Sequence, residues 1–236
     1  MKNKIYYLFI LTLFYFNPCK AQNASIGLFG GANARNISYG SNKFEHLNLG
    51  ADFGAFAEIM FSENFSLQPM VEYSAQGSKQ GAFVSFSNYD NNQLHNGVKF
   101  GELNYFMIPV LAKFGFGFGE KSPLRLYTSF GPYAAYLLSA DQVLVTSQGQ
   151  KVSGTSSDVK SQLRNINTGF EANAGISYQY KLSSIFIQAG GNYGLIKIQK
   201  NASNGSNYAG AAALTIGYTF WFDNNFLTNA RLHPKG

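Results

Sequence analysis

The chain has 236 residues, of which 16% are aromatic and only 13% are charged, and its formal net charge is +6. Three lysines near the N-terminus contribute to that charge. Without them, 15 basic residues stand against 12 acidic ones, a balance of +3. A charge this small and this scattered excludes nucleic acid as a partner.

Residues 1–21 are typical of a secretory signal peptide. Two lysines precede an apolar and aromatic run over residues 5–16, which is too short to span a bilayer, and small residues follow it. We expect cleavage after Ala21, so that the mature chain begins at Gln22. The lone Cys19 leaves with the signal, which excludes disulfides and thiol chemistry from the mature protein. Lipidation of Cys19 would need small residues before it, whereas a proline directly precedes it.

The mature chain then alternates apolar and polar residues in eight segments. A transmembrane β-strand needs about 9–11 residues, and each segment is at least that long. We find no helical periodicity and no second domain. The predicted strands are 25–35, 49–61, 66–77, 102–116, 124–138, 167–180, 184–196 and 208–222.

The connections between these segments alternate in length. Residues 62–65, 117–123 and 181–183 are short links, whereas the other connections are longer. Short turns at one end and long loops at the other are typical of an up-and-down outer-membrane barrel. An even strand number places both termini at the short-turn, periplasmic end. The long connections are 36–48, 78–101, 139–166 and 197–207.

The last three segments indicate which face contacts lipid. One face is apolar, with Ile187 and Leu214 near its middle, and the other carries polar residues such as Glu171 and Gln188. The polar face has too few charges for the outer wall of a soluble barrel. We therefore predict an all-β fold, an eight-stranded antiparallel up-and-down transmembrane β-barrel with its apolar face in lipid. The predicted aromatic girdle is Tyr178, Tyr180, Tyr193, Tyr218, Phe220 and Phe222.

Seven charged residues occupy alternate strand positions whose side chains are predicted to point into the lumen. Counting from the short turns predicts two tiers of paired charge that close the lumen. Glu58, Glu72, Lys113 and Arg125 form the lower tier, and Arg35, Asp52 and Glu171 form the upper one. Carboxylates in a narrow lumen are costly unless they are paired. The alternatives are that these charges hydrate in a wet lumen, or that they form a gate or proton path.

The sequence also resembles a known family. The stretches "IGLFGGANARNISY", "FSLQPMVEYSAQGSKQG", "LNYFMIPVLAKFGFG" and "FGPYAAYLLSA" resemble the outer-membrane β-barrel (PorT-like) porin family of Bacteroidetes-type bacteria. That resemblance implies an eight-stranded barrel in the cell outer membrane. One relative assists a type IX secretion system, which the resemblance offers as a candidate pathway for this chain.

Residues with catalytic or metal-binding chemistry are few. His46, His95 and His233 fall in two loops and the tail without the spacing of metal ligands. We therefore expect no catalytic residues, no cofactor and no metal, and predict that the protein is not an enzyme.

Three functions remain open from the sequence. The first is a structural or interaction barrel, monomeric in outer-membrane lipid, with loops 78–101 and 139–166 as the surface for a protein partner. These loops are equally consistent with extended hairpins that cover the barrel mouth. The second is a narrow small-solute porin, which an eight-stranded interior disfavours. The third is an outer-membrane enzyme. The barrel domain is predicted to span 22–222, and 223–236 to form a dispensable periplasmic tail.

Overall fold

The computed structural model describes residues 24–35, 49–78, 99–118, 122–145, 151–154, 160–200 and 208–222. The predicted signal peptide, the tail from residue 223 and much of the long loops lie outside these ranges, as do all three histidines.

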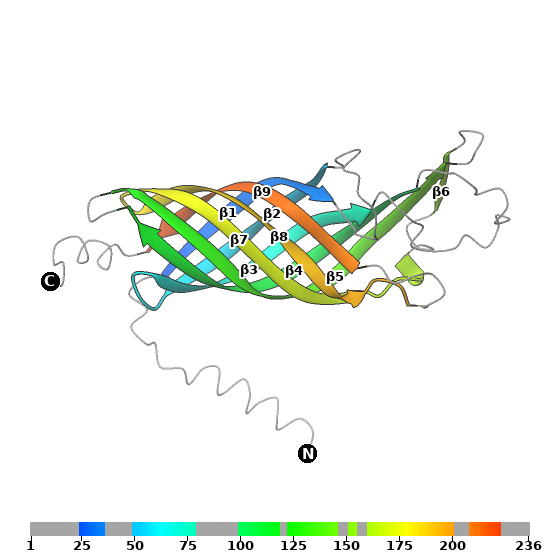
Figure 1. Ribbon diagram of the computed structural model, residues 1–236, viewed down its shortest axis with the longest axis horizontal. Coiled ribbons are helices and arrows are strands. Elements are labelled where there is room, and N and C mark those ends of the chain that lie inside the picture. The colour runs from blue at the N-terminus through cyan, green and yellow to red at the C-terminus, as the bar shows by residue number, and fades with distance from the viewer. Residues whose placement is uncertain are drawn as a thin grey trace, which may run out of the picture.

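Within these ranges, nine antiparallel strands form one sheet, and eight of them close into a barrel (Figure 1). Consecutive barrel strands pair with one another, and β1 pairs with β9 to complete the ring. The strands are β1 (Ala24–Arg35), β2 (Leu49–Met60), β3 (Phe65–Ser78), β4 (Lys99–Gly117), β5 (Leu124–Val145), β6 (Lys151–Gly154), β7 (Ile166–Tyr180), β8 (Ser183–Lys197) and β9 (Tyr208–Trp221).

The strands are steeply tilted. Followed once round the ring from Ser25, the paired residues return to β1 at Arg35, ten residues further along the same strand. In barrels this displacement is linked to the strand tilt, which is typically about 35–45°. Each strand is therefore displaced along the axis relative to its neighbour, and this displacement decides which inward side chains meet.

The predicted eight-stranded up-and-down barrel is confirmed. All eight predicted segments are strands, and most of their bounds agree within three residues. The structure differs at β5, which continues to Val145, and at β6, which was not predicted. β6 pairs with the end of β5 from Gln142↔Gly154 to Val145↔Lys151, so loop 139–166 contains a hairpin.

The two ends of the barrel are different. At one end are the short turns and the β1–β9 pair Ser25↔Trp221. At the other end β4 and β5 continue beyond the remaining strands, and β6 lies furthest out on this extension (Figure 1). We call the β5–β6 pairing and its connection the β5–β6 hairpin.

The outer wall is apolar and the inner wall is mixed. Leu28 and Leu214 are more than half exposed on the outside, whereas Ser25, Glu58 and Thr219 are buried inside. No helix in the described part of the chain is both long and apolar enough to cross a membrane. All six residues of the predicted girdle are at least 42% exposed, on the side opposite the lumen: Tyr178, Tyr180, Tyr193, Tyr218, Phe220 and Phe222.

Candidate functional site

The lumen opens at the short-turn end into a cavity of about 50 Å³. An ion pair spans one side of this cavity, where Lys113 Nζ on β4 lies 2.8 Å from Glu58 Oε2 on β2. Ser66 Oγ donates to the other Glu58 oxygen at 2.7 Å, and Lys113 Nζ also lies 4.4 Å from the centre of the Tyr127 ring. Both charges are therefore neutralised locally, in a region where an unpaired charge would be costly.

Arg125 lines the same cavity at the start of β5. Its guanidinium donates to the backbone carbonyl of Glu63 in the β2–β3 turn. The structure thus brings Glu58, Lys113 and Arg125 together at this end, as the lower tier predicts. Arg125 also contacts the carbonyl of Glu63 in the turn, and the alternation of inward and outward residues along the strand does not indicate this contact.

Above the cavity, aromatic rings from different walls meet across the lumen. Phe56 on β2 contacts Phe186 on β8 edge-on, with 5.8 Å between ring centroids, and Phe186 contacts Tyr127 on β5 at 6.3 Å. Phe29 on β1 lies 6.5 Å from Phe56. We call this group, completed by two aliphatic side chains, the aromatic layer: Phe29, Phe56, Met70, Leu111, Tyr127 and Phe186.

Glycines on neighbouring strands leave room for these rings. A Cβ atom at Gly27 would overlap the Phe56 ring, and one at Gly217 would overlap the Phe186 ring. A Cβ atom at Gly175 would lie 2.6 Å from the Tyr127 hydroxyl. Because these inward glycines have no side chain, the rings of the aromatic layer can pack against their backbone. A count of small residues in the sequence does not reveal this arrangement.

Three carboxyl groups form the next layer. Asp52 on β2, Glu72 on β3 and Glu171 on β7 are each at most 5% exposed and line one small cavity of about 10 Å³. Asp52 lies opposite Ser74 and Glu72 lies opposite Gly54, so the two side chains are diagonal neighbours on the inner wall of β2 and β3. Asn173 Nδ2 donates to Glu171 Oε1 at 2.8 Å. We call these three residues the acidic layer.

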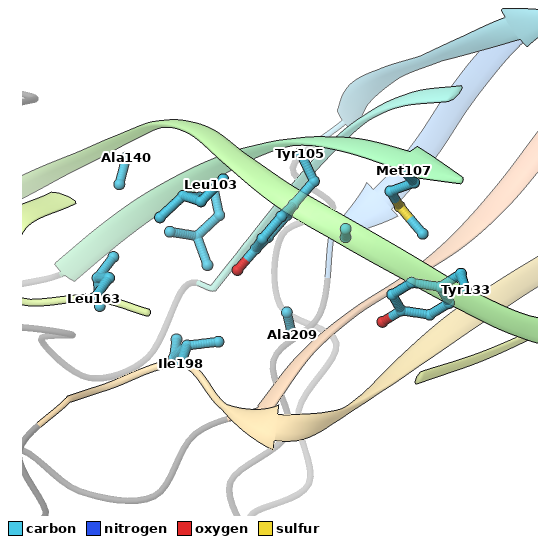
Figure 2. Packing of buried hydrophobic residues seen from close by; sticks show 10 residues of the cluster. Leu103, Tyr105, Met107, Tyr133, Ala140, Leu163, Ile198 and Ala209 are labelled. Carbon is cyan, nitrogen blue, oxygen red and sulfur yellow. The ribbon is translucent and has the colours of Figure 1, made fainter. Parts of the chain in front are cut away.

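A second apolar cluster closes the lumen beyond the acidic layer. Figure 2 shows Leu103, Tyr105 and Met107 of β4 facing Ile198 and Ala209 from the other side. All five side chains are at most 2% exposed. The described lumen is therefore filled at both ends of the acidic layer.

The predicted upper tier requires a correction. Glu72 was expected in the lower tier with Glu58, but it lies with Asp52 and Glu171, because it stands at the midpoint of β3 and opposite Gly54, two residues from Asp52. Arg35 ends β1, but its side chain lies outside the described part, so its pairing with Asp52 and Glu171 stays a prediction. Within the described residues, the acidic layer contains carboxyl groups and no cationic side chain.

The described residues contain no group of three or more His, Cys, Asp or Glu side chains that could hold a metal ion. The acidic layer is included in that result. Its donor set is carboxyl, amide and hydroxyl oxygen, the oxygen ligands that hard cations prefer, but its three carboxyl groups are not placed as a shared metal site requires.

A closed antiparallel barrel with an apolar exterior and a lumen filled by side chains defines a small membrane β-barrel protein. The chain belongs to the outer membrane protein beta-barrel domain family, whose model matches residues 20–200. It is therefore a protein of the outer membrane.

Several solved structures are similar to this chain, each at 15% sequence identity or less. OprG of Pseudomonas aeruginosa shares 10% identity over 86% of this chain and 96% of its own, with a TM-score of 0.45. A major outer membrane protein of Thermus thermophilus shares 11% over 84% and 99%, with a TM-score of 0.44. Ail of Yersinia pestis shares 15% over 84% and 99%, with a TM-score of 0.37. No curated protein matches the chain at a significant level.

Proposed function

We propose that this protein is a non-conducting, non-enzymatic outer-membrane barrel that acts through its extracellular extension. The observation that carries the proposal is the contact between Phe56 and Phe186 across the lumen, 5.8 Å between centroids. An eight-stranded barrel has an interior only just wide enough for side chains. Rings from β2, β5 and β8 meet inside the lumen and occupy the path that a solute would need.

The β5–β6 hairpin is the proposed contact surface for a partner protein. β4 and β5 have 19 and 22 residues, against 12–15 for the other barrel strands, so their ends project beyond the rim (Figure 1). Loops that are carried on a rigid scaffold are the usual place for recognition. A narrow solute pore is the alternative function, and participation in protein secretion is one pathway in which the hairpin could serve.

The test is planar-bilayer conductance of the full mature chain and of a variant that lacks residues 142–154. Both proteins should give no stable single-channel steps, because the aromatic layer lies inside the barrel and not in the hairpin. A variant with Phe56→Ala and Phe186→Ala should give small steps if it inserts. Large stable channels from the unaltered protein would contradict the proposal in favour of a porin.

The same hairpin variant tests the interaction. Both proteins would be crosslinked in intact outer membranes and recovered by affinity purification. A partner captured by the full chain and lost from the 142–154 variant supports the hairpin as the contact. Equal recovery of every partner by both proteins would contradict it.

A further inference from the structure

Four basic residues gather at the end of the barrel opposite the short turns. Lys160 and Arg164 precede β7, Lys197 ends β8, and Lys200 follows it. Arg164, Lys197 and Lys200 are exposed, and Lys160 is half-buried. We call these four residues the basic rim.

Backbone hydrogen bonds join the two segments that carry the basic rim. The Arg164 N–H donates to the Ile198 carbonyl at 2.8 Å, and the Lys200 N–H donates to the Gln162 carbonyl at 3.1 Å. Leu163 and Ile198 are at most 2% exposed and belong to the cluster that closes the lumen (Figure 2). The apolar side chains of both segments therefore anchor the backbone, which holds the basic residues close together at the rim.

Two of the lysines are fixed by contacts with neighbouring backbone. Lys160 Nζ donates to the Leu138 carbonyl on β5 at 2.9 Å and lies 5.3 Å from the centre of the Tyr136 ring. Lys200 Nζ donates to the Ser161 carbonyl at 2.6 Å. An ammonium group has three donors, so each lysine retains donors for a ligand. Because these side chains are already held, a ligand would have less side-chain entropy to remove on binding.

No acidic side chain in the described part of the chain forms an ion pair with the basic rim. From Ala172 to Phe222 the sequence contains neither Asp nor Glu, and Glu171 is buried in the lumen. On β5, Asp141 lies further out, opposite Glu102 of β4. The described rim on the β7–β8 side therefore carries positive charge that the protein does not neutralise, and this charge favours an anionic ligand.

The outer surface next to the basic rim is apolar. The outward-facing residues of β8 run from Tyr193 and Leu195, which are 54% and 55% exposed, directly to Lys197. On β7, Ile166 is 62% exposed and lies two residues from Arg164. Interfacial aromatic residues and cations are typical of the depth at which lipid headgroups lie. The basic rim is therefore placed at headgroup level, with an acyl-chain surface beside it.

We propose that the basic rim binds the phosphorylated headgroup of an anionic lipid in the outer leaflet. The long loops of outer-membrane barrels are extracellular, so this end of the barrel meets that leaflet. The planar guanidinium of Arg164 can donate two parallel hydrogen bonds to phosphate oxygens, and the lysines act as point charges. A soluble anion would contact these charges alone, whereas a lipid also covers Leu195 and Ile166 with its acyl chains.

The first test measures binding of lipid A, a glycolipid with two phosphate groups. The mature chain in neutral detergent would be titrated with this lipid, and native mass spectrometry would count the bound molecules. Each basic residue near an anionic headgroup contributes roughly five-fold to affinity. Lys197→Gln should therefore bind about five-fold more weakly, and Arg164→Gln combined with Lys197→Gln about 25-fold more weakly.

Lys181→Gln is the matched control for this titration. Lys181 is an exposed lysine in the β7–β8 turn at the other end of the barrel, 5.3 Å from the Tyr180 ring. Its removal changes the net charge by the same amount as Lys197→Gln and should leave lipid A binding unchanged. Heat-dependent gel mobility would show that each variant is folded. No binding by the unaltered protein, or an equal loss in Lys181→Gln and Lys197→Gln, would overturn the proposal.

Two further ligands show which part of the lipid is recognised. Lipid A without its phosphates should bind far more weakly, and an excess of inorganic phosphate should not displace lipid A. Equal binding of the dephosphorylated lipid would overturn the proposal. Displacement by inorganic phosphate would also overturn it, because the basic rim would then be a site for a soluble anion.

The variant that lacks residues 142–154 separates this inference from the proposed function. It keeps all four residues of the basic rim and should bind lipid A as tightly as the full chain does. Loss of lipid A from this variant would overturn the proposal and place the headgroup site on the β5–β6 hairpin. Capture of a partner protein by the hairpin is a separate measurement, so either result can fail without the other.

Discussion

Individual glycines determine how the lumen is filled. The Phe56 ring lies over Gly27 of the neighbouring strand, and the Phe186 ring lies over Gly217. In β-sheets an aromatic side chain across from a glycine covers the backbone that the glycine exposes. The backbone of β1 is close on both sides here, because a Cβ at Gly27 would also lie 2.7 Å from the carbonyl oxygen of Tyr218.

Gly27→Ala should therefore destabilise the barrel. The new methyl group would overlap the Phe56 ring and approach the β9 backbone, and overpacking of this kind costs about 1–3 kcal/mol. Gly30→Ala on the same strand is the control, since its Cβ would meet only Phe53 at an ordinary 3.8 Å. Urea unfolding in detergent micelles, followed by the fluorescence of the single tryptophan, measures both variants. Equal stability of the two would show that the lumen repacks freely.

The Glu58–Lys113 ion pair should show energetic coupling. Glu58→Gln and Lys113→Met each leave one charge in the cavity, so each single variant should lose stability. The double variant should lose less than the sum of the two, with a coupling energy of about 1–3 kcal/mol for residues in direct contact. The four proteins form a double-mutant cycle in the same urea assay. If the losses of the two single variants simply add, both charges are hydrated through the cavity at the short-turn end.

For the strands, the alternation of apolar and polar residues predicted the bounds of the barrel strands well. It did not predict the extension of β5 or the presence of β6. Residues 184–196 place apolar residues at every second position from Ile185 to Leu195, with glycine at 191, and β8 has nearly these bounds. The sequence "KVSG" of β6 has four residues and no alternation to detect. It is a strand only because β5 runs on beside it from Gln142 to Val145. Local residue type cannot indicate a pairing that depends on a distant partner.

The C-terminal strand should close the barrel without the residues that follow it. β9 ends at Trp221, and the Phe222 N–H donates to the Ala24 carbonyl at 3.0 Å. A chain that stops after Phe222 keeps every β1–β9 pair, from Ser25↔Trp221 to Arg35↔Ala211. It should therefore reach the outer membrane and show the same heat-dependent gel mobility as the full chain.

Truncation after Gly217 is the matched comparison for that experiment. It removes Tyr218 to Trp221 and so four residues of the seam with β1. This shorter chain should be degraded. Degradation of the chain that ends at Phe222 would instead assign part of the assembly signal to residues 223–236.

For the whole molecule, parity predicted which side chains enter the lumen but not which of them meet there. The inward positions of Glu58, Lys113 and Glu171 followed from alternation, and the structure buries Glu58 and Glu171 inside. Contacts across a barrel depend also on the displacement of ten residues around the ring. Period-two alternation contains no information on that displacement, so Glu72 was assigned to the wrong layer and the Phe56–Phe186 contact was not anticipated.

The β1–β9 seam has a consequence for how the protein enters the membrane. Its pairs join residues near opposite ends of the described chain, such as Ser25 and Trp221. Among the described strand pairs, these have the largest separation in sequence. Contacts of such separation form late, because the entropy of the intervening chain has to be lost first. Until they form, both outermost strands carry unpaired N–H and C=O groups, which lipid cannot satisfy. We therefore expect the strands to enter the bilayer together, with the ring nearly closed, and not one by one.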